Sequence, residues 1–219
     1  MSSLEQDGYA VVSDVLTSAE CTALADLLGA PPSAGRRGLL SVPEIRHLAA
    51  SEKLLTLVRP HLPTEPFAVR GIYFDKSPDT NWLVSWHQDL TICVQEKREV
   101  PGFGPWSVKE GVPHVQPPVE VLESMLTIRL HLDDTDETNG ALRVIPGSHK
   151  LGRLGNSQIQ PITASGQESM CIAPQGAALL IRPLILHSSS RSTSTRRRRV
   201  IHLEYACTPL DAGLEWQEA

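Results

Sequence analysis

The tripeptide His87-Gln88-Asp89 carries the side chains most suited to chemistry. It lies in an apolar run that predicts a strand, and alternate residues of a strand project to one face, so His87 and Asp89 aim at a common point. His187, at the end of a later apolar run, supplies a third ligand. Two imidazoles and one carboxylate suit iron(II), and such a set leaves coordination positions open for a bidentate 2-oxo acid and for dioxygen.

A bare His-x-Asp tripeptide is a weak signal, and the residues after His187 strengthen it. A serine-rich turn follows, and Arg198 then lies on the next apolar strand. A 2-oxoglutarate molecule that chelates iron through its keto and C1 carboxylate groups places its distal carboxylate some way from the metal. An arginine can grip that end with two parallel hydrogen bonds, and a nearby hydroxyl can add a third.

The N-terminal part, about residues 1–62, is expected to be mainly helical after a short strand at 8–12. Thr17 and Glu20 have the spacing of a capping box, and Gly29 should end the helix that follows. A second helix is predicted from about residues 41–44 to Pro60, because Pro43 suits a first helical turn.

The remainder, about residues 67–207, has the texture of a β domain. Its short runs of Val, Ile and Leu are separated by turns, and they predict strands at 67–74, 83–94, 125–132, 141–145, 168–172, 177–186 and 199–206. Nothing divides the chain, so a single domain over 1–219 is expected. The predicted fold is mainly β: a double-stranded β-helix (a jelly roll, cupin-like) with the N-terminal helices packed outside.

Residues 95–122 interrupt the strands with many prolines and glycines and predict a partly packed lid loop. Trp106 in this segment either packs over a substrate or fixes the loop locally. His114 is either a solvated loop residue or a substrate contact.

The bulk properties exclude several classes of protein. A formal net charge of -5 argues against nucleic-acid binding, and no apolar run approaches the length of a membrane span. The four cysteines have no C-x-x-C spacing and predict buried, reduced thiols. We therefore expect a cytoplasmic protein with a small-molecule substrate and neither a nucleic acid nor a membrane as partner; the oligomeric state stays open.

The chain resembles the phytanoyl-CoA dioxygenase family, which also contains ectoine hydroxylase. The likeness covers nearly the whole chain: Asp7-Gly8-Tyr9 with its Val-rich strand, the motif at 86–89, the segment Asn139-Gly-Ala-Leu-Arg-Val-Ile-Pro-Gly-Ser-His149, and the block from 187 to 198. The resemblance implies that His87, Asp89 and His187 bind iron. It also selects Arg198, eleven positions after His187, from a run of four arginines as the 2-oxoglutarate ligand, assisted by Ser189.

One departure from the family concerns the wall of the pocket. Where relatives often carry a tryptophan facing the active site, this chain has Arg129. If Arg129 points inward as a co-substrate contact, Thr127 and His131 should do so by alternation, which indicates a substrate or co-substrate with an anionic or strongly polar group. The predicted substrate contacts are Arg70, His131, Trp106 and Thr127.

The expected activity is oxidation, most simply hydroxylation, of a small molecule. Fe(II) is the expected cofactor, 2-oxoglutarate and O2 are the co-substrates, and succinate and CO2 are released. Asp89 argues against halogenation, because halogenating relatives replace this carboxylate with a small residue. Two alternatives stay open: a cupin-type metalloenzyme that does not use 2-oxoglutarate, and a non-catalytic binder of small molecules. His131 and His202 have the alternative of being core histidines. The sequence does not determine the substrate, the site of oxidation or the pathway. It also does not decide between hydroxylation and desaturation or cyclisation.

Overall fold

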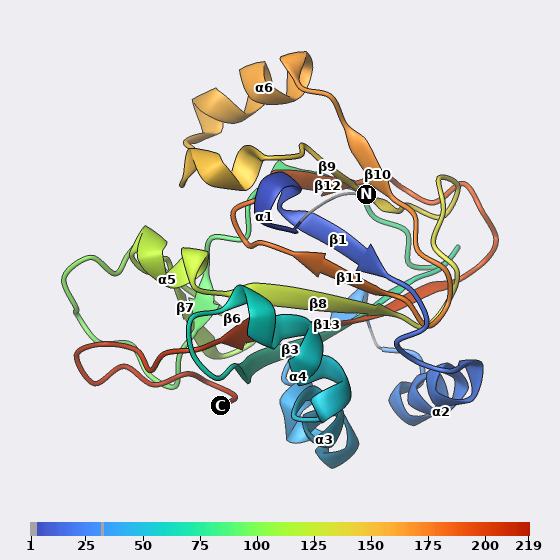
Figure 1. The fold of residues 1–219 in the computed structure, drawn as a ribbon, viewed down its shortest axis with the longest axis horizontal. Helices are drawn as coiled ribbons and strands as arrows, with labels where there is room; N and C mark the ends of the chain where they lie inside the picture. Colours follow the sequence, from blue (N-terminus) through green and yellow to red (C-terminus); the bar gives the residue numbers. More distant parts are fainter. Residues whose placement is uncertain (1–3, 32) are drawn as a thin grey trace.

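The computed structural model describes residues 4–31 and 33–219, and its centre is a pair of antiparallel β-sheets. The larger sheet has the order β1 (Tyr9–Val12), β11 (Ala178–Ile181), β8 (Leu126–His131), β13 (Arg198–Ala206), β3 (Phe67–Lys76) and β2 (Gly35–Arg36). The smaller sheet has the order β10 (Ser169–Cys171), β9 (Leu142–Val144), β12 (His187–Ser189) and β4 (Val84–His87). The two sheets lie one above the other (Figure 1). The predicted jelly-roll class is confirmed.

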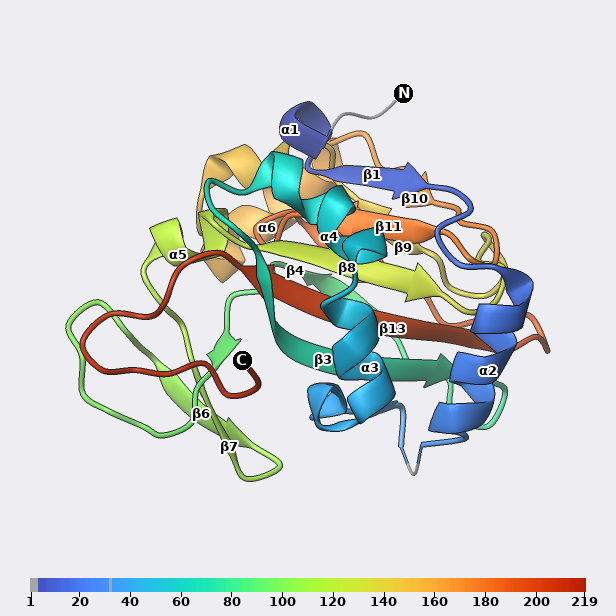
Figure 2. The ribbon, with the colours of Figure 1, turned by 60° about the horizontal axis from the view of Figure 1, so that its bottom comes forward.

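Helices cover the outer face of the larger sheet, as Figure 2 shows for α3 and α4. Helices α2 (Ser18–Leu28), α3 (Pro43–Ala49) and α4 (Glu52–Val58) lie on this side, and α1 (Leu4–Asp7) lies at the sheet edge before β1. Leu54 of α4 is fully buried in one cluster with Ile128 of β8 and Leu203 of β13. The capping box of α2 is present: the Glu20 amide donates to Thr17 Oγ1 (3.2 Å), and the Thr17 amide donates to the Glu20 carboxylate (2.8 Å).

The second N-terminal helix is interrupted, and the prediction of one continuous helix was wrong. Short 3-10 turns, η1 (Leu39–Ser41) and η2 (Arg59–His61), flank the pair α3 and α4. The helix is interrupted between α3 and α4. Ser51 has an extended backbone there, and its hydroxyl donates to Leu48 O (2.6 Å). This local bond competes with the helix. The break allows Ile45 and Leu54 to be buried in the same cluster.

Two predicted strands are shorter than their apolar runs. The run 83–94 is divided into β4 and β5 (Ile92–Cys93), because Gln88 leaves the ladder and its side chain bonds to Gly152 O, Leu184 O and the Leu154 amide. The run 177–186 ends as a strand at Ile181, shortly before Pro183, which has no amide hydrogen to donate. Within this loop, Pro183 O accepts from the Asp89 amide (2.9 Å), so both departures occur beside the predicted metal ligands.

Segments outside the predicted strands complete the structure. The segment 95–122 holds β6 (Trp106–Lys109), β7 (Val112–Val115) and α5 (Val119–Glu123), so it is more regular than a loop, and β5, β7 and β6 form a third sheet. After η3 (Ser148–Leu151), α6 (Asn156–Ser165) packs beyond the smaller sheet (Figure 1). None of the described helices is long and apolar enough to cross a membrane.

Candidate active site

A cavity of about 210 Å³ opens between the two sheets, and the three predicted metal ligands lie in its wall. Their ligand atoms, one from each of His87, Asp89 and His187, lie within 4.8 Å of one another. His87 Nε2 is 3.6 Å from Asp89 Oδ1, and His187 Nε2 is 3.6 Å from Asp89 Oδ2. The two imidazole centroids are 4.2 Å apart.

The pairing of β4 with β12 brings these ligands together, because it sets His187 directly opposite His87. Each imidazole is held by the chain two residues before it: His87 Nδ1 donates to Ser85 O (2.8 Å), and His187 Nδ1 donates to Ile185 O (3.0 Å). A backbone acceptor at Nδ1 fixes the tautomer that leaves the Nε2 lone pair free for a metal. Both Nε2 atoms lie on the side of the Asp89 carboxylate.

The charge states of Asp89 and His187 favour a divalent cation. Burial raises the pKa of Asp89, but His187 and His87 outweigh burial and hold that pKa well below its usual range. Burial lowers the pKa of His187 to about 4 against the opposing effect of Asp89. An ionised carboxylate and an unprotonated buried imidazole are the forms that bind metal. The donor set therefore fits iron(II).

Arg198, at the start of β13, is almost completely buried in the same cavity wall. Its Nη1 donates to Gly140 O (2.8 Å), and its Nε has no hydrogen-bond partner among the described residues. Burial lowers the pKa of Arg198 to about 9, with Arg129 contributing. The guanidinium is charged at neutral pH and keeps unused donors, as expected of an arginine that awaits an anion.

Lys76, the last residue of β3, stands behind this arginine and was not predicted. It is fully buried, and its Nζ donates to Ser189 Oγ (3.0 Å) and Ser190 O (2.7 Å). Burial, with Arg198 and Arg129 nearby, lowers the pKa of Lys76 to about 7. The signal available in the sequence was its spacing, because Lys76 shares strand parity with Arg70, Ile72 and Phe74, which line the cavity.

The carbonyl of Gly140 joins these groups, since it accepts from both Arg198 Nη1 and Ser189 Oγ (each 2.8 Å). Gly140 has a positive φ of 78°, and a Cβ there would lie 2.6 Å from Ser190 O and 2.9 Å from Lys76 Nζ. Only glycine fits this position without displacement.

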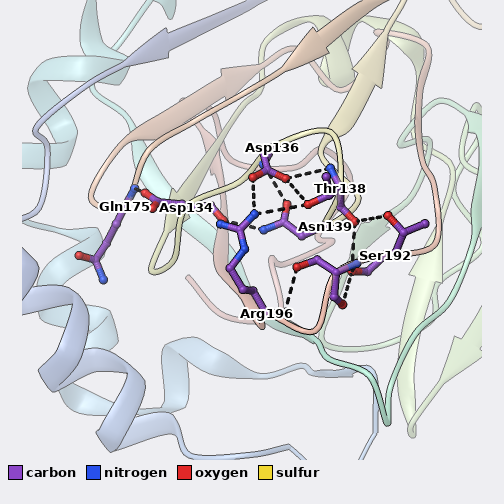
Figure 3. A network of polar contacts seen from close by, with 9 residues as sticks. Asp134, Asp136, Thr138, Asn139, Gln175, Ser192 and Arg196 are labelled. Carbon is purple, nitrogen blue, oxygen red and sulfur yellow. Dashed lines mark hydrogen bonds and ion pairs between the residues drawn. The ribbon is translucent and has the colours of Figure 1, made fainter.

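A polar network holds the turn that carries Gly140, as Figure 3 shows. Asn139 Nδ2 donates to Asp134 O (2.7 Å), and Asn139 Oδ1 accepts from the Asp136 amide (2.9 Å). Arg196 pairs with Asp136, and Thr138 O accepts from the Ser192 hydroxyl (3.3 Å). The network ties the turn to the loop between β12 and β13, which fixes the Gly140 carbonyl beside Arg198.

Arg129 projects from β8 into the cavity. Leu126, Ile128 and Leu130 of the same strand pack under the helices, so the alternate residue Arg129 faces the opposite side. Its Nη1 donates to His202 Nδ1 (2.9 Å), and its Nε has no partner among the described residues. Burial lowers the pKa of Arg129 to about 10, which leaves it charged at neutral pH.

Three of the predicted substrate contacts, His131, Thr127 and Trp106, lie outside the lining of this cavity. His131 Nδ1 bonds to Thr135 Oγ1 (2.7 Å) at the far end of β8. Thr127 is buried opposite Glu204 at the other end of that strand, and Trp106 packs against the cluster under the third sheet. Alternation gives the face of a strand but not the position along it.

Arg70 lies in the lining as predicted, but it is already paired: Nη1 is 3.0 Å from Glu204 Oε1, and Nη2 donates to His114 Nε2 (3.3 Å). His114 is fully buried by these contacts and by Val112 O, so it is neither solvated nor in the lining. His202 does line the cavity. Lining residues outside the predicted set include Arg37, Phe74, Trp82, Val84, Thr91 and Lys109.

Comparison with known proteins settles the family. Residues 4–200 match the family described as phytanoyl-CoA dioxygenase. The chain belongs to this family. The expected family membership is thereby confirmed.

Two curated relatives are similar over parts of the chain. A probable alpha-ketoglutarate-dependent hypophosphite dioxygenase of Stutzerimonas stutzeri is 26% identical over an alignment of 176 residues that covers 74% of this chain and 52% of the relative. An L-proline trans-4-hydroxylase of Streptomyces griseoviridis is 30% identical over an alignment of 106 residues that covers 36% of this chain and 40% of the relative. The chain thus spans about half of the length of the first relative and less than half of the second.

Solved structures confirm the fold. EctD from S. alaskensis has a TM-score of 0.71 at 18% identity, covering 93% of this chain and 74% of that one. HygX from Streptomyces hygroscopicus, solved with nickel and 2-oxoglutarate bound, has a TM-score of 0.67 at 19% identity, covering 95% and 89%.

Proposed function

We propose that this chain is an Fe(II)- and 2-oxoglutarate-dependent dioxygenase that oxidises, most simply hydroxylates, a small molecule with release of succinate and CO2. One observation carries the proposal. The open set of His87, Asp89 and His187 shares a cavity with Arg198, whose guanidinium keeps free donors. This is the arrangement that a metal-chelating 2-oxo acid with a second carboxylate requires.

His87, Asp89 and His187 would hold the metal through their Nε2 and carboxylate oxygen atoms. Iron(II), when bound there, supplies the oxygen-activating chemistry that side chains cannot. The chain supplies a preset ligand geometry, because backbone carbonyls already orient both imidazoles. It also supplies one negative charge, from Asp89. Because the chain provides only three ligands, the remaining coordination positions would be left to the co-substrate and dioxygen.

Arg198 would bind the distal carboxylate of 2-oxoglutarate. Its buried guanidinium offers hydrogen bonds in addition to the one spent on Gly140 O, and charge-assisted bonds in a dry site are strong. Lys76 adds a second basic side chain behind it, and the Ser189 hydroxyl accepts from Lys76 Nζ and donates to the same Gly140 carbonyl that Arg198 contacts. Apolar side chains line other parts of the cavity; they include Ile72, Phe74, Val84 and Leu142.

The relatives support this co-substrate but not one substrate. One is named for hypophosphite and another for L-proline, and HygX was solved with hygromycin B. The names differ too much in size and charge to carry a substrate to this chain. The two alternatives predict different behaviour: a cupin-type enzyme without 2-oxoglutarate would not need Arg198, and a non-catalytic binder would release no succinate.

The test is reconstitution with iron(II) and 2-oxoglutarate without oxygen, followed by admission of air. The complex should show visible charge-transfer absorption, and succinate should then form in proportion to the oxygen consumed. Asp89→Ala should lose both signals, whereas Lys150→Gln, which removes a surface charge away from the cavity, should keep both. Normal succinate formation by Asp89→Ala, or none by the unaltered chain with any substrate tried, would contradict the proposal.

A further inference from the structure

The cavity carries more positive charge than its own carboxylates balance. Its lining includes five basic side chains, Arg37, Arg70, Lys109, Arg129 and Arg198, and two acidic ones, Asp89 and Glu204. Arg70 is paired with Glu204 (3.0 Å), and the exposed Arg37 is paired with Glu110. Arg129, Arg198 and Lys109 have no carboxylate partner among the described residues.

The metal and the co-substrate do not remove this excess, an argument that rests on the proposed function. Divalent iron with Asp89 leaves one net positive charge, which the chelating carboxylate of 2-oxoglutarate cancels. The distal carboxylate pairs with Arg198, and Lys76 lies behind that arginine. Arg129 and Lys109 then still lack a counter-ion.

The missing counter-ion matters more for Arg129 than for Lys109, because Arg129 is only 6% exposed. Its one hydrogen-bond partner among the described residues is His202 Nδ1, and an arginine can only donate, so this nitrogen must be the unprotonated one. His202 Nε2 then carries the proton and donates to Glu204 Oε1 (3.3 Å). His202 is therefore neutral, and Glu204, which also binds Arg70, does not neutralise Arg129 directly.

A buried charge without a counter-ion is costly, so it is retained where a ligand pairs with it. The Nε–H of Arg129 also lacks an acceptor among the described residues, and the guanidinium belongs to a residue that lines the cavity. The space is small: about 210 Å³ lies below the usual range of roughly 300–1,000 Å³ for ligand pockets, and it must hold 2-oxoglutarate too.

We propose that the substrate is a small anion, a carboxylate or a phosphorus oxyanion of few heavy atoms, whose charged group pairs with Arg129. Lys109 and Arg37, exposed at the edge of the cavity, attract it from solvent. Arg129 is thus assigned to the substrate, whereas Arg198 is assigned to the co-substrate.

The test measures binding without turnover. Protein loaded with nickel(II) and saturating 2-oxoglutarate is titrated by calorimetry with acetate, inorganic phosphite and uncharged acetamide. We compare the unaltered chain with Arg129→Gln, Arg129→Lys and the control Lys150→Gln. The anions should bind and acetamide should not. Arg129→Gln should weaken anion binding about ten- to hundredfold, since it removes charge-assisted bonds, with partial recovery in Arg129→Lys and no change in Lys150→Gln.

The outcomes separate this inference from the proposed function. If 2-oxoglutarate fails to bind the unaltered, metal-loaded chain, the proposed function fails. If 2-oxoglutarate binds but acetamide binds as tightly as acetate, or the anions bind Arg129→Gln and the unaltered chain equally, only the inference fails. It fails also if Arg129→Gln loses 2-oxoglutarate and keeps the small anions. Preference between acetate and phosphite distinguishes the two sources of the oxyanion.

Discussion

Replacing Arg198 with glutamine should weaken the binding of 2-oxoglutarate by roughly a hundred- to a thousandfold. The guanidinium has donors in reserve at a buried position, so the distal carboxylate would accept at least two charge-assisted bonds from it. Such bonds contribute about 1.5–3 kcal/mol each, and the glutamine amide recovers part of one. A net loss of about 3–4 kcal/mol corresponds to that change in Kd.

The assay is calorimetric titration of 2-oxoglutarate into nickel-loaded protein, with metal content checked separately. Arg199→Gln is the matched control, because Arg199 follows Arg198 directly but faces the other side of β13, where it pairs with Asp133 (2.6 Å). It should bind 2-oxoglutarate normally. An unchanged Kd in Arg198→Gln, or equal losses in both variants, would refute the assignment of the distal carboxylate to Arg198.

Three further predictions concern the groups around Arg198 and the metal. Asp89→Ala should lower iron(II) affinity by at least about a hundredfold, measured by metal titration, since loss of an outer-shell partner alone costs 10–100-fold. The affinity for 2-oxoglutarate should be constant below pH 7 and fall above it, because a dianion favours protonated Lys76, whose pKa is lowered to about 7; Lys76→Met should abolish this dependence in titrations across pH. Gly140→Ala should lower the free energy of unfolding by at least about 2 kcal/mol in denaturant titrations, because φ is 78° and the Cβ would meet Ser190 O. The same variant should also bind 2-oxoglutarate more weakly. A variant as stable as the unaltered chain would show that the turn tolerates a side chain.

The metal site could be predicted because its ligands lie on strands with a strong apolar signal. His87 and Asp89 follow a two-residue period, and His187 ends a long apolar run. Their meeting could not be derived in the same way, because β12 is only His-Ser-Ser and has no apolar alternation. Its pairing opposite β4 depends on the whole arrangement of the smaller sheet.

Two of the predicted substrate contacts lie outside the cavity lining for a physical reason. Thr127 and His131 share the inward face with Arg129, but each lies two residues, about 6–7 Å, along β8, which takes it out of a small cavity. Lys76 was missed because a lysine at the end of a strand usually indicates a solvated position. The pair of Arg70 with Glu204 was equally hidden, since β3 and β13 are separated by more than 120 residues in the chain.

Part of the cavity rim has a separate structural origin from its floor. The metal ligands, Arg198 and Arg37 come from the two sheets or their immediate ends, whereas Lys109 lies on β6 of the third sheet. An exchange of Lys109 is therefore expected to leave the proposed metal centre intact. In such a scaffold the choice of incoming molecule can diverge during evolution while the co-substrate stays the same, and the hairpin of β6 and β7 is the place to redesign it.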